Sequence, residues 1–123
     1  MIKPVLVVED DRDCRDSLVD LLCQLGFEVR SACNGEEALQ LLKRMEAPCL
    51  ILLDLAMPVM DGEEFRARQL ADPVLAKVPV ILISADAELR EKAERLKVEA
   101  AIGKPFDAGL LLATMSRHWN VRL

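Results

Sequence analysis

Short apolar runs alternate along the chain with stretches in which apolar residues recur at helical spacing. The central run, Leu50 to Leu53, is apolar at every position and is followed by a single carboxylate, Asp54. A run of this kind is typical of a strand that is buried on both faces of a parallel sheet. Strands are predicted at residues 4–9, 27–33, 50–53, 78–83 and 100–103.

A helix is predicted after each of these strands. Apolar residues there recur every three or four positions, as on the buried face of a helix. Gly26 is expected to end the first helix, because glycine readily adopts the backbone of a helix C-terminus. The later helices are expected at residues 35–45, 61–71, 86–97 and 107–119.

Short polar side chains precede several helices and are predicted to cap them. Asn34 and Asp61 come before acidic first turns, and Glu64 stands three residues after Asp61, as in a capping box. Asp86 is predicted to cap the fourth helix. Asp11 is predicted to be a first-turn charge of the first helix.

Five strands that alternate with five helices predict a three-layer α/β sandwich. Parallel strands joined by helices need right-handed crossovers, which place helices on both faces of the sheet. The chain has 123 residues, of which 52% are hydrophobic, and this is enough for one core. Because no repeat, low-complexity segment or linker is present, we expect a single domain over residues 1–123.

Charge and hydropathy exclude several classes of partner. The net charge is −5 and the isoelectric point about 4.9, whereas binding to nucleic acid favours a basic face. No apolar run approaches a membrane span, and the N-terminus shows no signal-peptide pattern. We therefore expect a cytoplasmic protein with no direct nucleic-acid or membrane partner.

Cysteine and histidine usage argues against disulfides and against a zinc or histidine-based site. No Cys-x-x-Cys pair occurs, and each cysteine lies in an apolar or helix-like stretch, so we expect small reduced core residues. The cysteines are Cys14, Cys23, Cys33 and Cys49. The single histidine, His118, is expected on a helix surface.

Polar side chains stand at the predicted C-terminal ends of four strands. They are Glu9 and Asp10 after the first strand, Asp54 after the third, Ser84 at the end of the fourth and Lys104 after the fifth. In a parallel sheet these ends share one edge, where ligands bind, so the side chains can converge. Each alone could simply cap or turn the chain, but polar groups rarely enter apolar strands, and the whole set favours a functional site.

These residues together supply the parts needed to handle a phosphoryl group. Three neighbouring carboxylates resist full ionisation, and a divalent cation relieves their repulsion. An all-oxygen carboxylate site suits Mg²⁺. Lys104 adds a positive charge and Ser84 a hydroxyl donor, beside an anionic oxygen nucleophile.

Four motifs, in order and spacing over essentially the whole chain, resemble the receiver domain of two-component response regulators, of the chemotaxis-regulator type. They are Val-Val-Glu-Asp-Asp at residues 7–11, Asp-Leu-Ala-Met-Pro at 54–58 with Met-Asp-Gly at 60–62, Val-Ile-Leu-Ile-Ser-Ala at 80–85, and Lys-Pro-Phe at 104–106. The resemblance implies a flavodoxin-like (βα)5 sandwich in which a parallel five-stranded sheet has the strand order 2-1-3-4-5.

The resemblance also implies roles in a phosphorelay. Asp54 would accept a phosphoryl group from a phosphohistidine on a sensor histidine kinase or a histidine phosphotransfer protein. Asp10 and Asp54 would bind Mg²⁺ directly, Glu9 through a water molecule, and the backbone carbonyl of Ala56 would complete the protein ligands.

The remaining site residues would act on the phosphoryl oxygens. Ser84 and Lys104 would hold these oxygens, and a cis peptide bond before Pro105 would help to aim the lysine. Such a domain catalyses its own phosphorylation and dephosphorylation but is not otherwise an enzyme. It passes the signal to a downstream protein target, as a monomer or weak homodimer.

The chain departs from the family three residues before the lysine. The family usually has Tyr or Phe there, and this aromatic reorients when the hydroxyl residue moves toward the phosphate, whereas the residue here is Ala101. We expect phosphorylation to be sensed instead by shifts of the loop at 84–89 and of the fourth helix. Ala56 and Asp86 occupy positions that tune the lifetime of the phosphate in this family.

Other interpretations stay open. An atypical receiver that acts as a phosphorylation-independent protein-interaction module is the main alternative, because Ala101 removes the usual switch. A Mg²⁺-dependent phosphatase with an aspartyl nucleophile usually needs a second aspartate where the chain has Ala56. A flavin-binding domain would need a Ser/Thr-rich phosphate loop after the first strand, and that loop is absent from the sequence.

Overall fold

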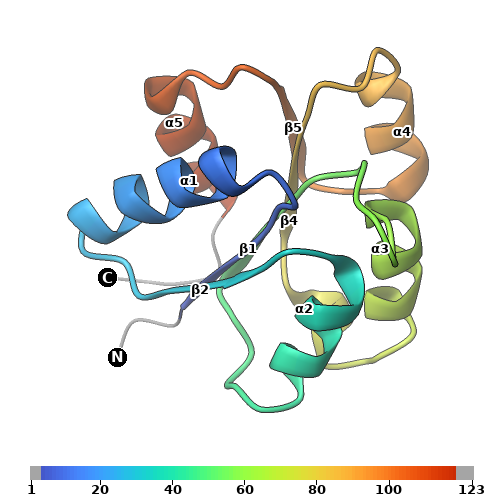
Figure 1. Cartoon of the computed structure of the whole chain (residues 1–123). Helices are drawn as coiled ribbons and strands as arrows, with labels where there is room; N and C mark the ends of the chain where they lie inside the picture. Colours follow the sequence, from blue (N-terminus) through green and yellow to red (C-terminus); the bar gives the residue numbers. More distant parts are fainter. Residues whose placement is uncertain (1–3, 119–123) are drawn as a thin grey trace.

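Four apolar runs and the mixed segment at residues 29–32 form one parallel sheet (Figure 1). The computed structural model describes residues 4–118. The strands are β1 (Val5–Val8), β2 (Val29–Ala32), β3 (Leu50–Leu53), β4 (Val80–Ser84) and β5 (Ala100–Gly103). They lie in the order β2-β1-β3-β4-β5, which confirms the predicted sheet and its strand order.

Helices cover both faces of this sheet. They are α1 (Arg12–Gln24), α2 (Gly35–Leu42), α3 (Gly62–Leu70), α4 (Leu89–Leu96) and α5 (Ala108–His118), with a short 3-10 helix, η1 (Leu75–Lys77), before β4. α1 and α5 lie on one face, and α2, α3 and α4 lie on the other (Figure 1). Within residues 4–118, none of these helices has the length and apolar character required to cross a membrane.

Alternate residues of the central strands fill two separate cores. In β1, Val7 belongs to the core under α1 and α5 together with Leu18, whereas Leu6 belongs to the opposite core together with Phe65. All four side chains are at most 1% exposed. Full burial of such a side chain stabilises the fold by about 1.5–3 kcal/mol. Burial on both faces explains why the central strands show no alternation of polar residues.

Two of the predicted helix caps are confirmed, and a third residue has a different role. The side chain of Asn34 accepts a hydrogen bond from the amide three residues later at 2.8 Å, and that of Asp61 does the same at 2.9 Å. Asp11, predicted as a first-turn charge, is instead the N-cap of α1. Its carboxylate accepts hydrogen bonds from the amides of Asp13 and Cys14.

The fourth helix begins later than predicted. α4 starts at Leu89, and its N-cap is Glu88, whose side chain makes no capping hydrogen bond. Asp86 does not cap the helix. Its carboxylate closes the preceding turn by accepting from the Glu88 amide at 2.7 Å and from the Lys92 ammonium at 2.6 Å.

The ends of other helices and strands also differ from the prediction by a few residues. α2 ends at Leu42, so that Met45 lies in the following loop. α5 begins one residue after Asp107, whose carboxylate accepts from the amide two residues later at 2.8 Å. Trp119, the predicted end of this helix, lies outside the described residues. The edge strand β2 spans only Val29–Ala32.

The prediction that all the cysteines are core residues is wrong for Cys23 and Cys33, whereas Cys14 packs against the core under α1 and α5. Cys49 is buried, Cys14 and Cys33 are half-buried, and Cys23 is exposed. None of the four cysteines takes part in a disulfide bond. Cysteine packs as a small apolar residue, so a position beside a helical stripe does not decide whether its side chain faces the core. His118, expected on a helix surface, is half-buried.

Candidate functional site

The strand register aligns two of the predicted carboxylates. Val8 of β1 pairs with Leu53 of β3, so Glu9 and Asp54 follow neighbouring strands at the same level. The Asp54 amide donates to the carbonyl of Val8 at 3.0 Å, which extends the ladder to the site residue itself. Both carboxylates are buried, Glu9 at 2% and Asp54 at 5% exposure.

Strands β4 and β5 bring the hydroxyl of Ser84 and the side chain of Lys104 to the site. Ser84 ends β4 and pairs with Gly103 of β5. The amide of Lys104, the following residue, donates to the Ser84 carbonyl at 3.0 Å. The four strand ends therefore lie along one edge of the sheet, as predicted from the parallel arrangement.

Asp54 is held at both oxygens. Its Oδ1 accepts from the amide of Leu55 at 2.7 Å, and its Oδ2 accepts from the Lys104 ammonium at 3.1 Å. These contacts fix the orientation of the carboxylate, and the lysine balances its negative charge in a nearly buried position. Asp54 is therefore a carboxylate of fixed orientation beside a cation.

Lys104 links the two buried carboxylates. Its ammonium forms an ion pair with Glu9 as well as with Asp54. Burial by itself would lower the pKa of Lys104, but the hydrogen bonds to Glu9 and Asp54 outweigh this effect and raise it, so the amine stays charged. The Lys104–Pro105 peptide bond is cis, as the resemblance implies.

The carboxyl group of Glu9 resists ionisation. Burial raises the pKa of Glu9 above its usual value, and hydrogen bonding with Asp54 raises it further, whereas Lys104 opposes the rise. One lysine does not fully compensate the crowded negative charge. A proton on Glu9 and a bound cation are two alternative ways to complete this compensation.

The donor atoms suit a hard divalent cation. Ligand atoms of Glu9, Asp10 and Asp54 lie within 4.8 Å of one another. Ala56 lines the same pocket, and within residues 4–118 its carbonyl oxygen accepts no hydrogen bond. Carboxylate and carbonyl oxygens are the ligands that Mg²⁺ takes in proteins. The residues predicted to hold Mg²⁺ therefore fit it in type and position.

Two residues of α1 that the sequence analysis did not single out also reach the site. The guanidinium of Arg15 donates to the carbonyl of Glu9 at 3.0 Å and to that of Asp10 at 3.5 Å, which fixes the backbone of the acidic pair. Cys14 hydrogen-bonds to Glu9, and burial followed by this contact raises the pKa of its thiol to about 12. Both residues lie in the first turn and a half after the acidic pair, and this position in the sequence could have indicated that their side chains reach the site.

The open part of the site is a pocket of about 440 Å³. Its lining includes Asp54, Ala56, Ser84 and Lys104, together with Asp10, Asp11, Ala85 and Asp86. The Ser84 hydroxyl is 2% exposed and accepts from the amide of Asp86 at 3.2 Å. The pocket therefore brings together the predicted nucleophile, hydroxyl, cation and metal ligands.

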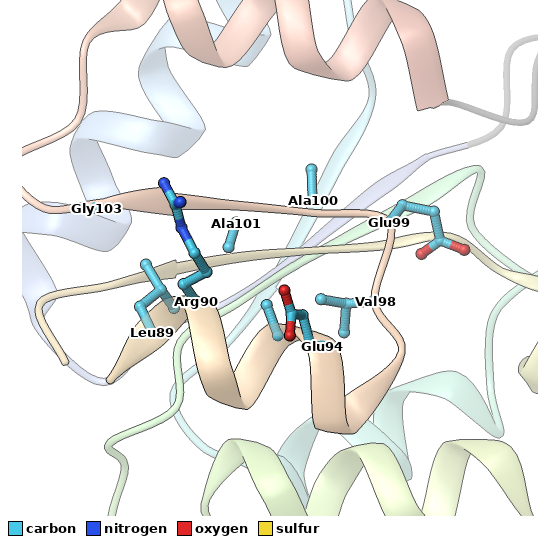
Figure 2. A pocket seen from close by; sticks show the side chains of 9 residues that line it. Leu89, Arg90, Glu94, Val98, Glu99, Ala100, Ala101 and Gly103 are labelled. Atoms are coloured by element: carbon cyan, nitrogen blue, oxygen red, sulfur yellow. The ribbon is translucent and has the colours of Figure 1, made fainter. Parts of the chain in front are cut away.

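A second pocket, of about 460 Å³, lies between α4 and β5. Figure 2 shows Ala101 on β5 opposite the side chains of Leu89 and Arg90 on α4. Ala101 stands three residues before Lys104, at the position where the sequence has no aromatic residue. The methyl group leaves this space between the helix and the strand open.

Comparison with known proteins agrees with the observed fold and with the family that the sequence motifs resemble. The response regulator receiver domain model matches residues 5–116. The chain is 35% identical over 116 residues to Protein Rrf1 of Nitratidesulfovibrio vulgaris, covering 92% of this chain and 80% of Rrf1. It is 37% identical over 120 residues to response regulator protein FleR of Pseudomonas aeruginosa, covering 96% of this chain but only 25% of FleR.

A solved structure gives the same result for the fold. The chemotaxis protein CheY4 of Vibrio cholerae superposes with a TM-score of 0.87 at 27% sequence identity. The match covers 96% of this chain and 99% of the CheY4 chain. The similarity therefore extends over the full described fold, including the edge of the sheet where the site residues lie.

Proposed function

Since the chain belongs to the response regulator receiver domain family of two-component systems, we propose that it is a phosphoacceptor in a phosphorelay. Asp54 receives the phosphoryl group, and a phosphohistidine donates it. The observation that carries the proposal is the position of Asp54, nearly buried and hydrogen-bonded to Lys104 beside the carboxylates of Glu9 and Asp10.

The chemical step is an in-line displacement at phosphorus. A carboxylate oxygen of Asp54 attacks, a P–O bond forms, and the P–N bond to the donor imidazole breaks. The bond electrons pass to the imidazole nitrogen, which takes up a proton as it leaves. The product on Asp54 is an acyl phosphate. Catalysis of such a step is mainly positioning and electrostatic stabilisation, which the fixed Asp54 and Lys104 provide.

Each of the other site residues has a defined part. Lys104 binds a phosphoryl oxygen through its ammonium, and Ser84 donates its hydroxyl to another. Glu9, Asp10, Asp54 and the carbonyl of Ala56 would hold Mg²⁺. When bound, Mg²⁺ neutralises negative charge on the phosphoryl oxygens and the carboxylates. With these parts the domain catalyses its own phosphorylation and its own hydrolytic dephosphorylation.

The proposed partners follow from this chemistry. The donor is a sensor histidine kinase or a histidine phosphotransfer protein, and the recipient of the signal is a downstream protein target. We propose a single receiver domain over residues 1–123, as a monomer or weak homodimer. The chain spans a quarter of FleR and four fifths of Rrf1, so the output of a longer protein is not specified by this domain.

The test is phosphorylation of the purified protein by acetyl phosphate, followed by intact mass spectrometry. With Mg²⁺ the wild type should gain one phosphoryl group, which hydroxylamine should remove because it is an acyl phosphate. Asp54→Asn should gain none, and chelation of Mg²⁺ should prevent the gain in the wild type. A wild type that stays unmodified under these conditions would refute the proposal.

A phosphorylation-independent interaction module is the second candidate. It is favoured by Ala101, which leaves the pocket between α4 and β5 without the aromatic that usually reports phosphorylation. In this case Asp54→Asn would bind a downstream partner as tightly as the phosphorylated wild type does. A phosphoacceptor would instead show an affinity that depends on acetyl phosphate in the wild type alone.

A further inference from the structure

The pocket at the edge of the sheet carries one more carboxylate than the predicted chemistry uses. It is lined by four aspartates and a single lysine. Asp10 and Asp54 are proposed metal ligands, and Asp11 is engaged as the N-cap of α1. The fourth is Asp86, two residues after Ser84. An additional negative charge here opposes the approach of a phosphodonor, which is itself an anion.

The carboxylate of Asp86 is occupied by other partners. Its Oδ1 accepts from the Glu88 amide at 2.7 Å, and its Oδ2 lies 2.6 Å from the ammonium of Lys92. Lys92 lies on α4, outside the pocket lining. The hydrogen bond from Lys92 lowers the pKa of Asp86, and Asp86 raises that of Lys92, so both partners of the pair stay ionised.

Lys92 also forms a longer ion pair with α3. Glu63 of α3 lies 3.9 Å from the ammonium, but Glu63 is itself paired with Arg95 at 2.9 Å. The short contact of Lys92 is thus the one with Asp86. Arg95, one turn further along α4, completes an ion pair with α3 and has no contact with Asp86.

From these contacts we propose that Lys92 is a positioning residue for phosphoryl transfer, a role that rests on the function proposed above. It neutralises Asp86 and helps to hold the carboxylate against the turn at Glu88. Without Lys92, the Asp86 carboxylate keeps only the hydrogen bond from the Glu88 amide, and its negative charge in the pocket lining is no longer compensated.

This arrangement also connects the pocket to α4. None of the residues in α4 is fully buried. The buried Arg66 side chain holds the C-terminal end of α4 by donating to the carbonyls of Leu96 at 3.1 Å and Lys97 at 2.8 Å. The ion pair of Lys92, the fourth residue of α4, joins the first half of the helix to Asp86 in the preceding turn.

The experiment compares two variants with the same charge change on the same helix, Lys92→Gln and Arg95→Gln. Phosphorylation by acetyl phosphate with Mg²⁺ is followed by intact mass over time. Lys92→Gln should be phosphorylated about three- to tenfold more slowly than wild type, because a carboxylate near the nucleophile loses its counter-charge. Arg95→Gln should stay within about twofold of wild type, since the long-range effect of a surface charge is screened by salt.

A rescue by a second substitution distinguishes a positioning role of Lys92 from a general loss of structure. If Lys92 acts through Asp86, the double variant Asp86→Asn/Lys92→Gln should regain the rate of Asp86→Asn alone, which should be at least that of wild type. Equal rates for Lys92→Gln and Arg95→Gln would overturn the proposal, as would a slow Lys92→Gln that Asp86→Asn fails to rescue. If the wild type itself is not phosphorylated, the proposed function fails, which is a different outcome from either of these.

Discussion

Lys104 and Asp54 are fifty residues apart in the sequence, yet the ammonium of Lys104 lies 3.1 Å from Oδ2 of Asp54. The same ammonium contacts the buried carboxylate of Glu9. One cation is thus shared between carboxylates from two neighbouring strands. The contact depends on the register of β1, β3, β4 and β5, so the site exists only in the folded sheet.

The first prediction concerns Lys104. Lys104→Met should be phosphorylated by acetyl phosphate at least about a hundredfold more slowly than wild type, the cost of removing one preorganised donor to a developing charge. Lys43→Gln, which removes an exposed charge at the end of α2, serves as the control and should leave the rate unchanged. A Lys104→Met rate close to wild type would show that Lys104 is not a phosphoryl ligand.

The second prediction concerns pH and Mg²⁺. In the folded protein the pKa of Glu9 lies above its usual value of 4.5, so the folded state binds a proton more tightly than the unfolded state. Without metal, the stability contributed by this proton should be complete below about pH 4.5 and lost as the pH rises through the raised pKa. Mg²⁺ at about a hundred times its Kd should add about 2.7 kcal/mol at neutral pH, and less in acid, where the proton competes.

Thermal melts at several pH values, with and without Mg²⁺, would check this behaviour. Glu9→Gln should flatten the pH dependence of the metal-free protein, because the titrating group is gone. A stabilisation by Mg²⁺ that is the same at pH 5 and pH 8 would contradict the assignment of Glu9 to the metal site.

The third prediction concerns the glycine at the start of α3. A Cβ added at Gly62 would meet the carbonyl oxygen of Asp54 and would lie 2.8 Å from Cα of Leu55, both backbone atoms that cannot turn away. Gly62→Ala should destabilise the protein by about 1–3 kcal/mol and slow phosphorylation, because the displaced segment carries Asp54, the proposed phosphoacceptor. Gly103→Ala is the matched control. Its added Cβ has no atom within 4 Å, so denaturant melts should place it close to wild type.

The fourth prediction concerns the anchor of α4. The side chain of Arg66 is 4% exposed and donates to Gln69 as well as to the two carbonyls at the end of α4. Arg66→Met should lower the free energy of unfolding by about 2–4 kcal/mol, because buried acceptors lose their donors. Hydrogen exchange should accelerate in α4 more than in α1. Arg68→Met removes only an exposed ion pair with Glu64 and should cost less than about 1 kcal/mol.

The fifth prediction concerns strain beside the site. Val59 has φ of 68°, a left-handed conformation that β-branched residues rarely adopt, and its side chain is 75% exposed. Val59→Gly should raise the free energy of unfolding by about 0.5–1 kcal/mol, since relief of the backbone strain exceeds the entropy cost of glycine. Val74, with φ of −76° and 66% exposure, is the control. Val74→Gly should be destabilising, and the same sign for both variants would contradict the argument.

The sequence was sufficient to predict the sheet and the convergence of the site, because both follow from local pattern and parallel topology. Continuous apolar runs predicted every strand except β2, which mixes apolar and polar residues, and polar residues at strand ends predicted Glu9, Asp54 and Lys104. The role of Asp86 could not be predicted in this way. Its preference for capping is local, whereas the partner that decides its position, Lys92, lies across a turn whose geometry depends on the fold.

The same limitation applies to the anchor of α4 and to the cysteines. An arginine inside a helix normally indicates an exposed face, and only the packing of α3 against α4 buries Arg66. Likewise, the burial of Cys49 and the exposure of Cys23 depend on which helical or strand face meets the sheet. Residue type alone does not contain that information.

The C-terminal ends of all the strands lie at one edge of the sheet. Insertions near this edge and insertions near the opposite edge should therefore have very different effects on the site. Neighbouring residues of a strand point to opposite faces, so adding one residue within β3 would rotate Asp54 away from Lys104. The connection between α2 and β3, at residues 43–49, lies at the far edge and includes exposed positions at 43, 44 and 46. A fluorescent reporter inserted there would leave the site geometry intact.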